Sequence, residues 1–136
     1  MPAFGQKSTA RLATCDPRLV TLFTEVVKGY DCVILEGARS VQDELANIAK
    51  GTSKLTDPMH SKHVVDPVTR PLALAVDASP FPVDWANTER FVHFAGYVLA
   101  HAHGQGIGIR WGGAWSGTRN KPGGFDDLVH FELQDA

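Results

Sequence analysis

The stretch 72–78 constrains the fold more than any other part of the sequence, because it alternates strictly and carries a carboxylate. Leucine and valine occupy its first, third and fifth positions, whereas two alanines and Asp77 occupy the second, fourth and sixth. Such alternation predicts a β-strand with an apolar core face. A carboxylate on a core strand is costly unless its charge is paired, protonated or bound to a metal. Considered alone, Asp77 is explained most simply by an ion pair or a hydrogen bond.

Hydrophobic spacing and capping residues predict the other elements. Helices are expected where apolar residues recur every three or four positions behind a capping residue. The three caps are Asp16, Ser40 and Asn87 or Thr88. The middle helix has a narrow apolar stripe made of Val41, Leu45, Ile48 and Ala49. Strands besides 72–78 are expected at 32–35, 107–111 and 128–133, and long loops at 52–71 and 112–124. This order predicts an α+β fold with helices packed on a small, mainly antiparallel sheet.

Composition limits the class of protein and its partners. The 136 residues suit a single domain spanning 1–136, and 43% hydrophobic with 21% charged residues is an ordinary globular balance. A net charge of −2 with scattered Lys and Arg argues against a nucleic-acid partner. No apolar run resembles a signal peptide or is long enough to span a bilayer, so synthesis in the cytoplasm without membrane insertion is expected. Cys15 and Cys32 are expected to be buried thiols, with a disulfide as the alternative.

Two histidines and a second aspartate can join Asp77 in one site. The 128–133 strand places His130 and Glu132 on the face opposite its apolar residues, and Asp127 lies three positions before His130. His63 lies in the long loop. Two imidazoles and one carboxylate form a suitable zinc set that leaves a fourth position for water. A carboxylate that is not a ligand can then move the proton, which fits Asp127.

Several short motifs resemble the VanY-like family of zinc D-alanyl-D-alanine and L-alanyl-D-glutamate peptidases, most nearly its single-domain phage endolysins. The motifs are Ser61-x-His63, Leu74-Ala75-Val76-Asp77, Trp111-Gly112-Gly113 and the 125–133 stretch FDDLVHFEL. The early stretch Glu36-Gly37-Ala38-Arg39-Ser40 also matches the family's arginine motif. The resemblance covers about residues 17–133 and implies a Hedgehog/DD-peptidase-like fold.

The resemblance implies a role for each matched residue. It assigns one zinc ion per chain to His63, Asp77 and His130, with Asp127 as general base and acid. Arg39 would bind the substrate carbonyl or stabilise the developing oxyanion.

Four further residues are expected near the substrate or the ligands. Ser61 would make a hydrogen bond to the substrate or to a ligand, and Glu132 would orient a ligand. Trp111 and Trp115 either line the substrate groove or pack at the sheet edge.

The chain also departs from the family pattern. The stretch 64–72 contains an insertion between the first histidine and the aspartate, which makes His60 a rival of His63. Ala114 replaces the aspartate of Trp-Gly-Gly-Asp-Trp, and Glu44 or Asp43 stands where relatives often carry glutamine.

Three functions are compatible with these residues. The leading hypothesis is an L-alanyl-D-glutamate endopeptidase that cuts peptidoglycan stem peptides and lyses bacterial cells. It is expected to act as a monomer on the cell wall after another factor releases it. The alternatives are a D-alanyl-D-alanine carboxypeptidase and, from another class, a non-catalytic zinc-containing wall-binding module.

Overall fold

The structure is a computed structural model that describes residues 1–53, 55–114 and 127–134. Its sheet has the strand order β1-β2-β4-β3, and each neighbouring pair is antiparallel. The strands are β1 (Cys32–Glu36), β2 (Ala75–Pro80), β3 (Ile109–Trp111) and β4 (His130–Leu133). The predicted α+β fold with a small antiparallel sheet is therefore confirmed.

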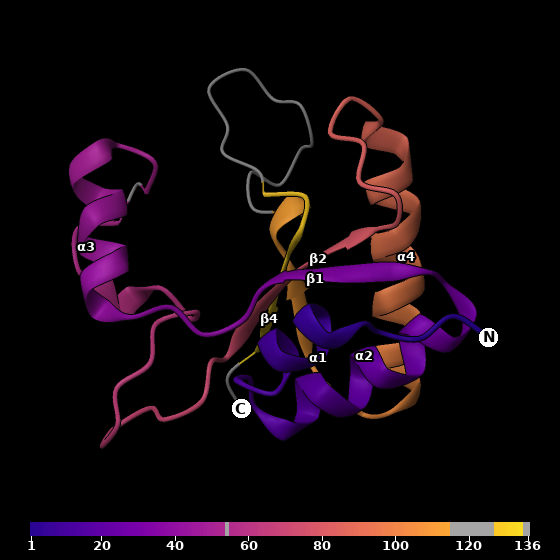
Figure 1. Cartoon of the computed structure of the whole chain (residues 1–136), viewed down its shortest axis with the longest axis horizontal. Coiled ribbons are helices and arrows are strands. Elements are labelled where there is room, and N and C mark those ends of the chain that lie inside the picture. The colour runs from indigo at the N-terminus through magenta and orange to yellow at the C-terminus, as the bar shows by residue number, and fades with distance from the viewer. Residues whose placement is uncertain (54, 115–126, 135–136) are drawn as a thin grey trace.

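Helices α2 (Pro17–Gly29) and α4 (Thr88–Gly104) pack on the apolar face of this sheet (Figure 1). Phe131 of β4 lies at the centre of the packing. Its ring lies 5.6 Å from that of Phe23 in α2 and 6.0 Å from that of Phe94 in α4, both edge-on. These aromatic contacts fix which face of β4 is buried and leave the alternate residues for the opposite face.

The predicted helix caps are confirmed. The Asp16 carboxylate accepts the Arg18 amide at the start of α2, and Ser40 Oγ accepts the Asp43 amide before α3 (Val41–Lys50). The Asn87 side chain accepts the Arg90 amide before α4. Gly51 ends α3 with φ +78°, a conformation in which glycine avoids the strain of a side chain.

The helix α1 (Gln6–Leu12) was not predicted from the sequence. It buries only Ser8 and Leu12, which is too little apolar surface for a recognisable stripe. Ser8 Oγ accepts the Ile34 amide at 3.0 Å, and the Arg11 guanidinium donates to the Ile34 carbonyl at 3.0 Å. Side chains of α1 therefore provide hydrogen-bond partners for the amide and carbonyl of Ile34 in the edge strand β1.

The strand predicted at 72–78 is displaced toward the C-terminus, since β2 begins at Ala75 and ends at Pro80. The Ala73 amide donates to the Thr14 carbonyl and the Leu74 amide to the Lys62 carbonyl. These contacts tie the two residues to neighbouring loops and delay the start of the strand.

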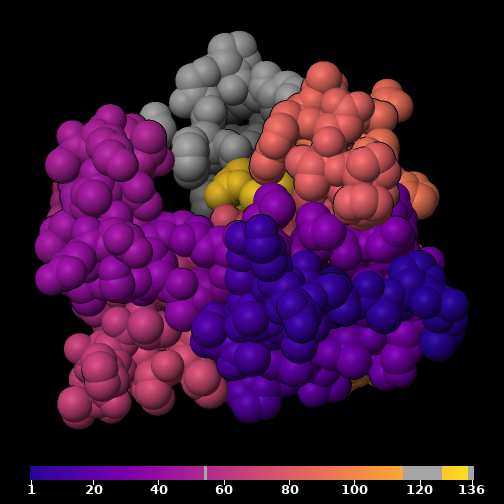
Figure 2. Space-filling view, in the orientation of Figure 1, coloured from indigo at the N-terminus to yellow at the C-terminus, as the bar shows by residue number. Residues whose placement is uncertain are grey.

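The apolar stripe predicted for α3 is wrong. Leu45 is 48% exposed, whereas Glu44 is the one fully buried residue of the helix. This helix and the segment after it form one flank of the molecule, away from α2 and α4 (Figures 1 and 2). The buried residue of α3 is therefore held by polar partners, Arg39 and Ser53, rather than by the apolar core.

Two further expectations concern the thiols and the membrane. Cys15 and Cys32 are both buried and form no disulfide, as expected. Within the described ranges, no helix has the length and apolar character needed to cross a bilayer.

Candidate metal centre

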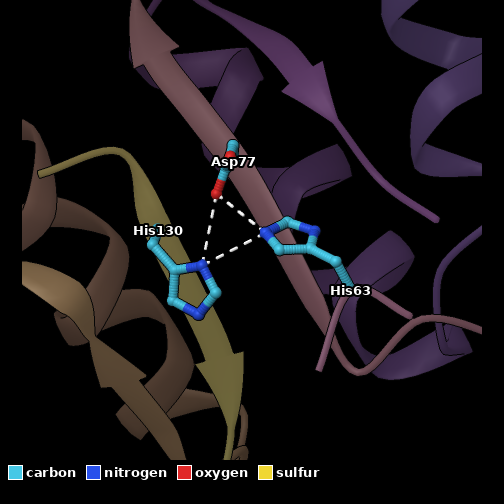
Figure 3. A group of neighbouring side chains, drawn as sticks. All are labelled: His63, Asp77 and His130. Carbon is cyan, nitrogen blue, oxygen red and sulfur yellow. Dashed lines mark hydrogen bonds and ion pairs between the residues drawn. The ribbon is translucent and has the colours of Figure 1, made fainter. Parts of the chain in front are cut away.

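His63, Asp77 and His130 converge on one point, as Figure 3 shows. Asp77 of β2 lies directly opposite His130 of β4 in the antiparallel register, and the loop before β2 brings His63 to them. His63 Nε2 lies 3.0 Å from Asp77 Oδ1 and 3.1 Å from His130 Nδ1, and His130 Nδ1 lies 3.3 Å from Asp77 Oδ1. Three potential ligand atoms from distant parts of the chain thus face one another.

The ring of His63 is oriented by the backbone of Gly37. Its Nδ1 lies 2.8 Å from the Gly37 carbonyl, which can only accept, so Nδ1 carries the proton and Nε2 presents its lone pair. A Cβ on Gly37 would lie 2.2 Å from the Arg11 carbonyl oxygen. Glycine is therefore required for the close approach that places this carbonyl behind His63.

The ring of His130 contacts Glu132, the residue predicted to orient a ligand. Its Nε2 lies 2.8 Å from Glu132 Oε1, and because a carboxylate only accepts, Nε2 donates. In the neutral ring, Nδ1 then presents its lone pair toward Asp77 and His63. Lys62 Nζ lies 3.3 Å from the other oxygen of Glu132 and fixes that carboxylate in turn.

This donor set fits a divalent cation. Three acceptor atoms that face one another at 3.0–3.3 Å repel unless a cation or a proton lies between them. Tetrahedral zinc with ligands at 2.0–2.1 Å requires separations of about 3.3 Å between ligand atoms. His63, Asp77 and His130 therefore have the chemistry and the spacing to hold zinc through Nε2, Oδ1 and Nδ1.

The pKa values of Asp77 and His130 are shifted because these two groups lie so close together. Burial by itself raises the pKa of Asp77, but hydrogen bonds to His130 and His63 lower it well below its usual range. Burial by itself lowers the pKa of His130, but hydrogen bonds to Asp77 and Glu132 raise it to about 9. The carboxylates of Asp77 and Glu132 thus favour a positive charge on or beside the His130 ring.

Asp127 lies beside the ligands without joining them. Its amide donates to the Gly112 carbonyl at 3.0 Å, and its carbonyl accepts the His130 amide. A Cβ on Gly112 would lie 2.3 Å from the Asp127 carbonyl oxygen and 3.0 Å from His130 Cβ, so only glycine permits this approach. Burial raises the pKa of Asp127, and the charge of Asp77 raises it further.

His63, Asp77 and His130 together form the metal group. A cleft of about 500 Å³ is lined by two of its members, His63 and His130. The polar face of the sheet lines one side, and α3 with the segment after it lines the other. The predicted site residues Arg39, Ser61, Asp127 and Glu132 all line this cleft together with His63. The structure thus brings most of the proposed site to a single cavity.

Arg39 lies in the cleft wall between two carboxylates. Its Nε and Nη2 both pair with Glu36, and its Nη1 donates to Glu44 Oε1 at 2.7 Å. Ser53 Oγ donates to the other oxygen of Glu44 at 2.7 Å. Glu44 departs from the family pattern, and its binding to Arg39 was not predicted from the sequence. Its position five residues after Arg39 gives no local pattern that would reveal the pair.

Trp111 is not among the described residues that line the cleft. It lies opposite Phe131 in the β3–β4 register, packs against the core, and donates from Nε1 to the Leu128 carbonyl at 2.9 Å. These contacts favour the alternative that Trp111 packs at the sheet edge, and its contact with substrate stays a prediction. Trp115 lies outside the described residues, as do most of the loop expected at 112–124 and Asp126.

Arg70, in the stretch 64–72, holds the loop that carries His63. Arg70 donates from Nη1 to the Ser61 carbonyl at 2.8 Å and the Val64 carbonyl at 3.3 Å, and from Nη2 to the Met59 carbonyl at 3.2 Å. Its guanidinium therefore binds carbonyls on both sides of His63.

His60 does not join the metal group. Its side chain is exposed and lies 3.8 Å from Asp57. Of the two rival histidines, the structure brings His63 to Asp77 and His130.

Comparisons with known proteins give a consistent assignment. Residues 2–134 match the model of a family described as phage L-alanyl-D-glutamate peptidase. The L-alanyl-D-glutamate peptidase of Escherichia phage T5 is 32% identical over 120 residues, which span 85% of this chain and 82% of that protein. The crystal structure of the Serratia marcescens L-Ala D-Glu endopeptidase ChiX superposes with a TM-score of 0.75 at 23% identity, over 98% of this chain and 91% of that one. The shared fold confirms the expected architecture, and the family match establishes that this chain belongs to the phage L-alanyl-D-glutamate peptidase family.

Proposed function

We propose that this chain is a zinc-dependent L-alanyl-D-glutamate endopeptidase that cleaves the stem peptide of peptidoglycan and so lyses bacterial cells. The observation that carries the proposal is the convergence of His63 Nε2, Asp77 Oδ1 and His130 Nδ1, with Asp127 in the same cleft. Membership of a family described by this activity supports the choice of substrate.

Zinc held by these ligands would act as a Lewis acid that polarises the scissile carbonyl and makes water a nucleophile near neutral pH. Asp127 accepts the proton of the attacking water and returns it to the leaving amine. The raised pKa of Asp127 suits both steps, because a base whose pKa is closer to the working pH returns its proton more readily.

The surrounding residues keep the reacting groups in place. Gly37 and Glu132 fix the tautomers of His63 and His130, so that their lone pairs face the metal position. Glu36 and Glu44 hold the Arg39 guanidinium in the cleft wall, from where it would bind the substrate carbonyl oxygen.

Digestion of purified peptidoglycan tests this function. Cleavage at the proposed bond releases peptides whose new amino terminus is D-glutamate, which end-group analysis detects. Addition of a chelator should stop the release, and zinc should restore it. Release of D-alanine without new D-glutamate termini would instead identify a carboxypeptidase. Binding to the wall without any cleavage would identify a binding module.

A further inference from the structure

The cleft has a cationic side chain that none of the described residues neutralises. Among the described residues, the lysine and arginine side chains that line the cleft are Arg39, Lys62 and Arg110. Arg39 is paired with Glu36 and Glu44. Lys62 donates to the Leu133 carbonyl and pairs with Glu132. Two of the three positive charges are therefore held by the protein's own acceptors.

Arg110 is different. It is exposed on β3, and within the described part of the chain its guanidinium has neither a hydrogen bond nor an ion pair. Its cross-strand neighbour is Glu132, the natural candidate for an ion pair. The two carboxylate oxygens of Glu132 are already bound to His130 and Lys62. The guanidinium of Arg110 thus remains available to a ligand in the cleft.

The sheet register places Arg110 close to the metal group. Residues directly opposite in neighbouring strands share a face, so Arg110 and Glu132 lie on the face that carries His130 and Asp77. Arg110 is the diagonal neighbour of His130, a relationship that separates two residues by about 7–8 Å. An extended arginine side chain can therefore bind a group a few bonds from the scissile amide.

The substrate offers such a group. Glutamate has two carboxyl groups, and a peptide that continues through one of them leaves the other as a charged carboxylate. When glutamate supplies the leaving amine, this carboxylate lies a few bonds from the scissile nitrogen. A guanidinium binds a carboxylate through two parallel hydrogen bonds, which gives both affinity and orientation.

We propose that Arg110 is a specificity-determining residue that binds the free carboxylate of the glutamyl residue on the leaving side of the scissile bond. This inference rests on the proposed function. It accounts for an arginine without a partner among the described residues, in a cleft where Arg39 and Lys62 are both paired.

The test compares two stem peptides that differ only in this carboxylate, which is replaced by a carboxamide in the second peptide. Values of kcat/KM are measured on both peptides for the zinc-loaded wild type and for Arg110→Gln and Arg110→Lys. Arg18→Gln is the control, because Arg18 lies on α2 outside the cleft and its loss changes the net charge equally.

The wild type should prefer the carboxylate peptide by about tenfold or more, the effect of a hydrogen bond between charged groups. Arg110→Gln should lose this preference by slowing cleavage of the carboxylate peptide alone, Arg110→Lys should keep part of it, and Arg18→Gln should keep all of it. An unchanged preference in Arg110→Gln, or an equal loss on both peptides, would overturn the inference while leaving the proposed function in place. A wild type that cleaves neither peptide would overturn both.

Discussion

His130 donates from Nε2 to the Glu132 carboxylate at 2.8 Å, and this contact turns its Nδ1 toward Asp77 and His63. A carboxylate behind a metal-binding imidazole fixes the tautomer and raises the basicity of the ligand. The two residues are neighbours on the same face of β4, so the strand supplies both the ligand and the group that orients it.

Replacement of Glu132 should weaken zinc binding. Glu132→Ala removes the acceptor behind His130, and loss of such a contact typically lowers metal affinity about 10- to 100-fold. Glu132→Gln keeps an acceptor oxygen without the charge and should have a smaller effect. Competition with a chromophoric chelator measures the affinity, with the exposed Glu89→Gln on α4 as the control. Equal affinity in Glu132→Ala and the wild type would contradict the role of this contact.

Asp127→Asn should separate catalysis from metal binding. The amide cannot accept the proton of water, so kcat should fall by about 10²- to 10⁴-fold, the usual contribution of general acid–base catalysis. Zinc stoichiometry should remain that of the wild type, because Asp127 is not one of the three converging ligands. The exposed Asp84→Asn is the matched control. Wild-type turnover in Asp127→Asn would remove this residue from the mechanism.

Gly112→Ala should disturb the base and a ligand together. The added Cβ would lie 2.3 Å from the Asp127 carbonyl oxygen and 3.0 Å from His130 Cβ, so the backbone around Asp127 must move. The added Cβ comes closer to Asp127 than to His130, so Asp127 should be displaced more. Activity should therefore fall more than zinc affinity. Gly96→Ala is a suitable control, since a Cβ there meets nothing within 4 Å. Full activity in Gly112→Ala would contradict the need for a close contact between Gly112 and Asp127.

Removal of the Glu44 carboxylate should destabilise the cleft wall. Glu44 is fully buried and holds both Arg39 and Ser53, so Glu44→Ala leaves the part-buried Arg39 guanidinium without one of its partners. Breaking a buried ion pair from one side typically costs about 3–5 kcal/mol, and Glu36 should reduce that cost here because it still pairs with Arg39. Urea unfolding measures the change. Glu44→Gln retains an acceptor for Arg39 and should lose less; a larger loss than in Glu44→Ala would contradict the assignment.

The stability of the metal-free protein should depend on pH in a defined direction. Although burial opposes it, the hydrogen bonds to Asp77 and Glu132 raise the pKa of His130 to about 9, against about 6.5 in an unfolded chain. The contribution of His130 to folding stability is fully present below about pH 6.5 and is lost as the pH rises toward 9. Asp77 has a lowered pKa, so its contribution is present above about pH 4 and is lost at lower pH.

Urea unfolding in the presence of a chelator, between pH 4 and pH 10, tests this dependence. His130→Gln should flatten the decline above pH 6.5, because the titrating ring is gone. Zinc affinity of the wild type should rise over the same range, since the metal displaces the proton of His130. A metal-free protein that gains stability between pH 6.5 and pH 9 would contradict the proposed interactions of His130.

The parts of the fold that follow local rules could be predicted from the sequence. Helices α2 and α4 have both a cap and a broad apolar stripe, and β4 alternates around His130. Helix α1 was missed because a seven-residue helix with two buried positions has no clear periodicity. The buried face of α3 was assigned wrongly because Glu44 is buried by ion pairing, which hydrophobic spacing cannot reveal.

In the candidate site, too, some features could be predicted from the sequence and others could not. The three proposed ligand residues were predicted by type and motif, and the structure brings them together. The partners of Arg39 lie three and five residues away in the chain, but neither spacing predicts an ion pair outside a regular helix, and the pairs were not foreseen. The side on which Trp111 lies could have been inferred from alternation, because Ile109 and Trp111 share a face and Arg110 lies on the other.

Anomalous diffraction at the zinc absorption edge, from crystals of the zinc-loaded protein, would locate the metal directly. One peak should lie about 2.0–2.2 Å from each of His63 Nε2, Asp77 Oδ1 and His130 Nδ1. No peak at this position, or zinc bound only by other residues, would contradict the proposed metal centre.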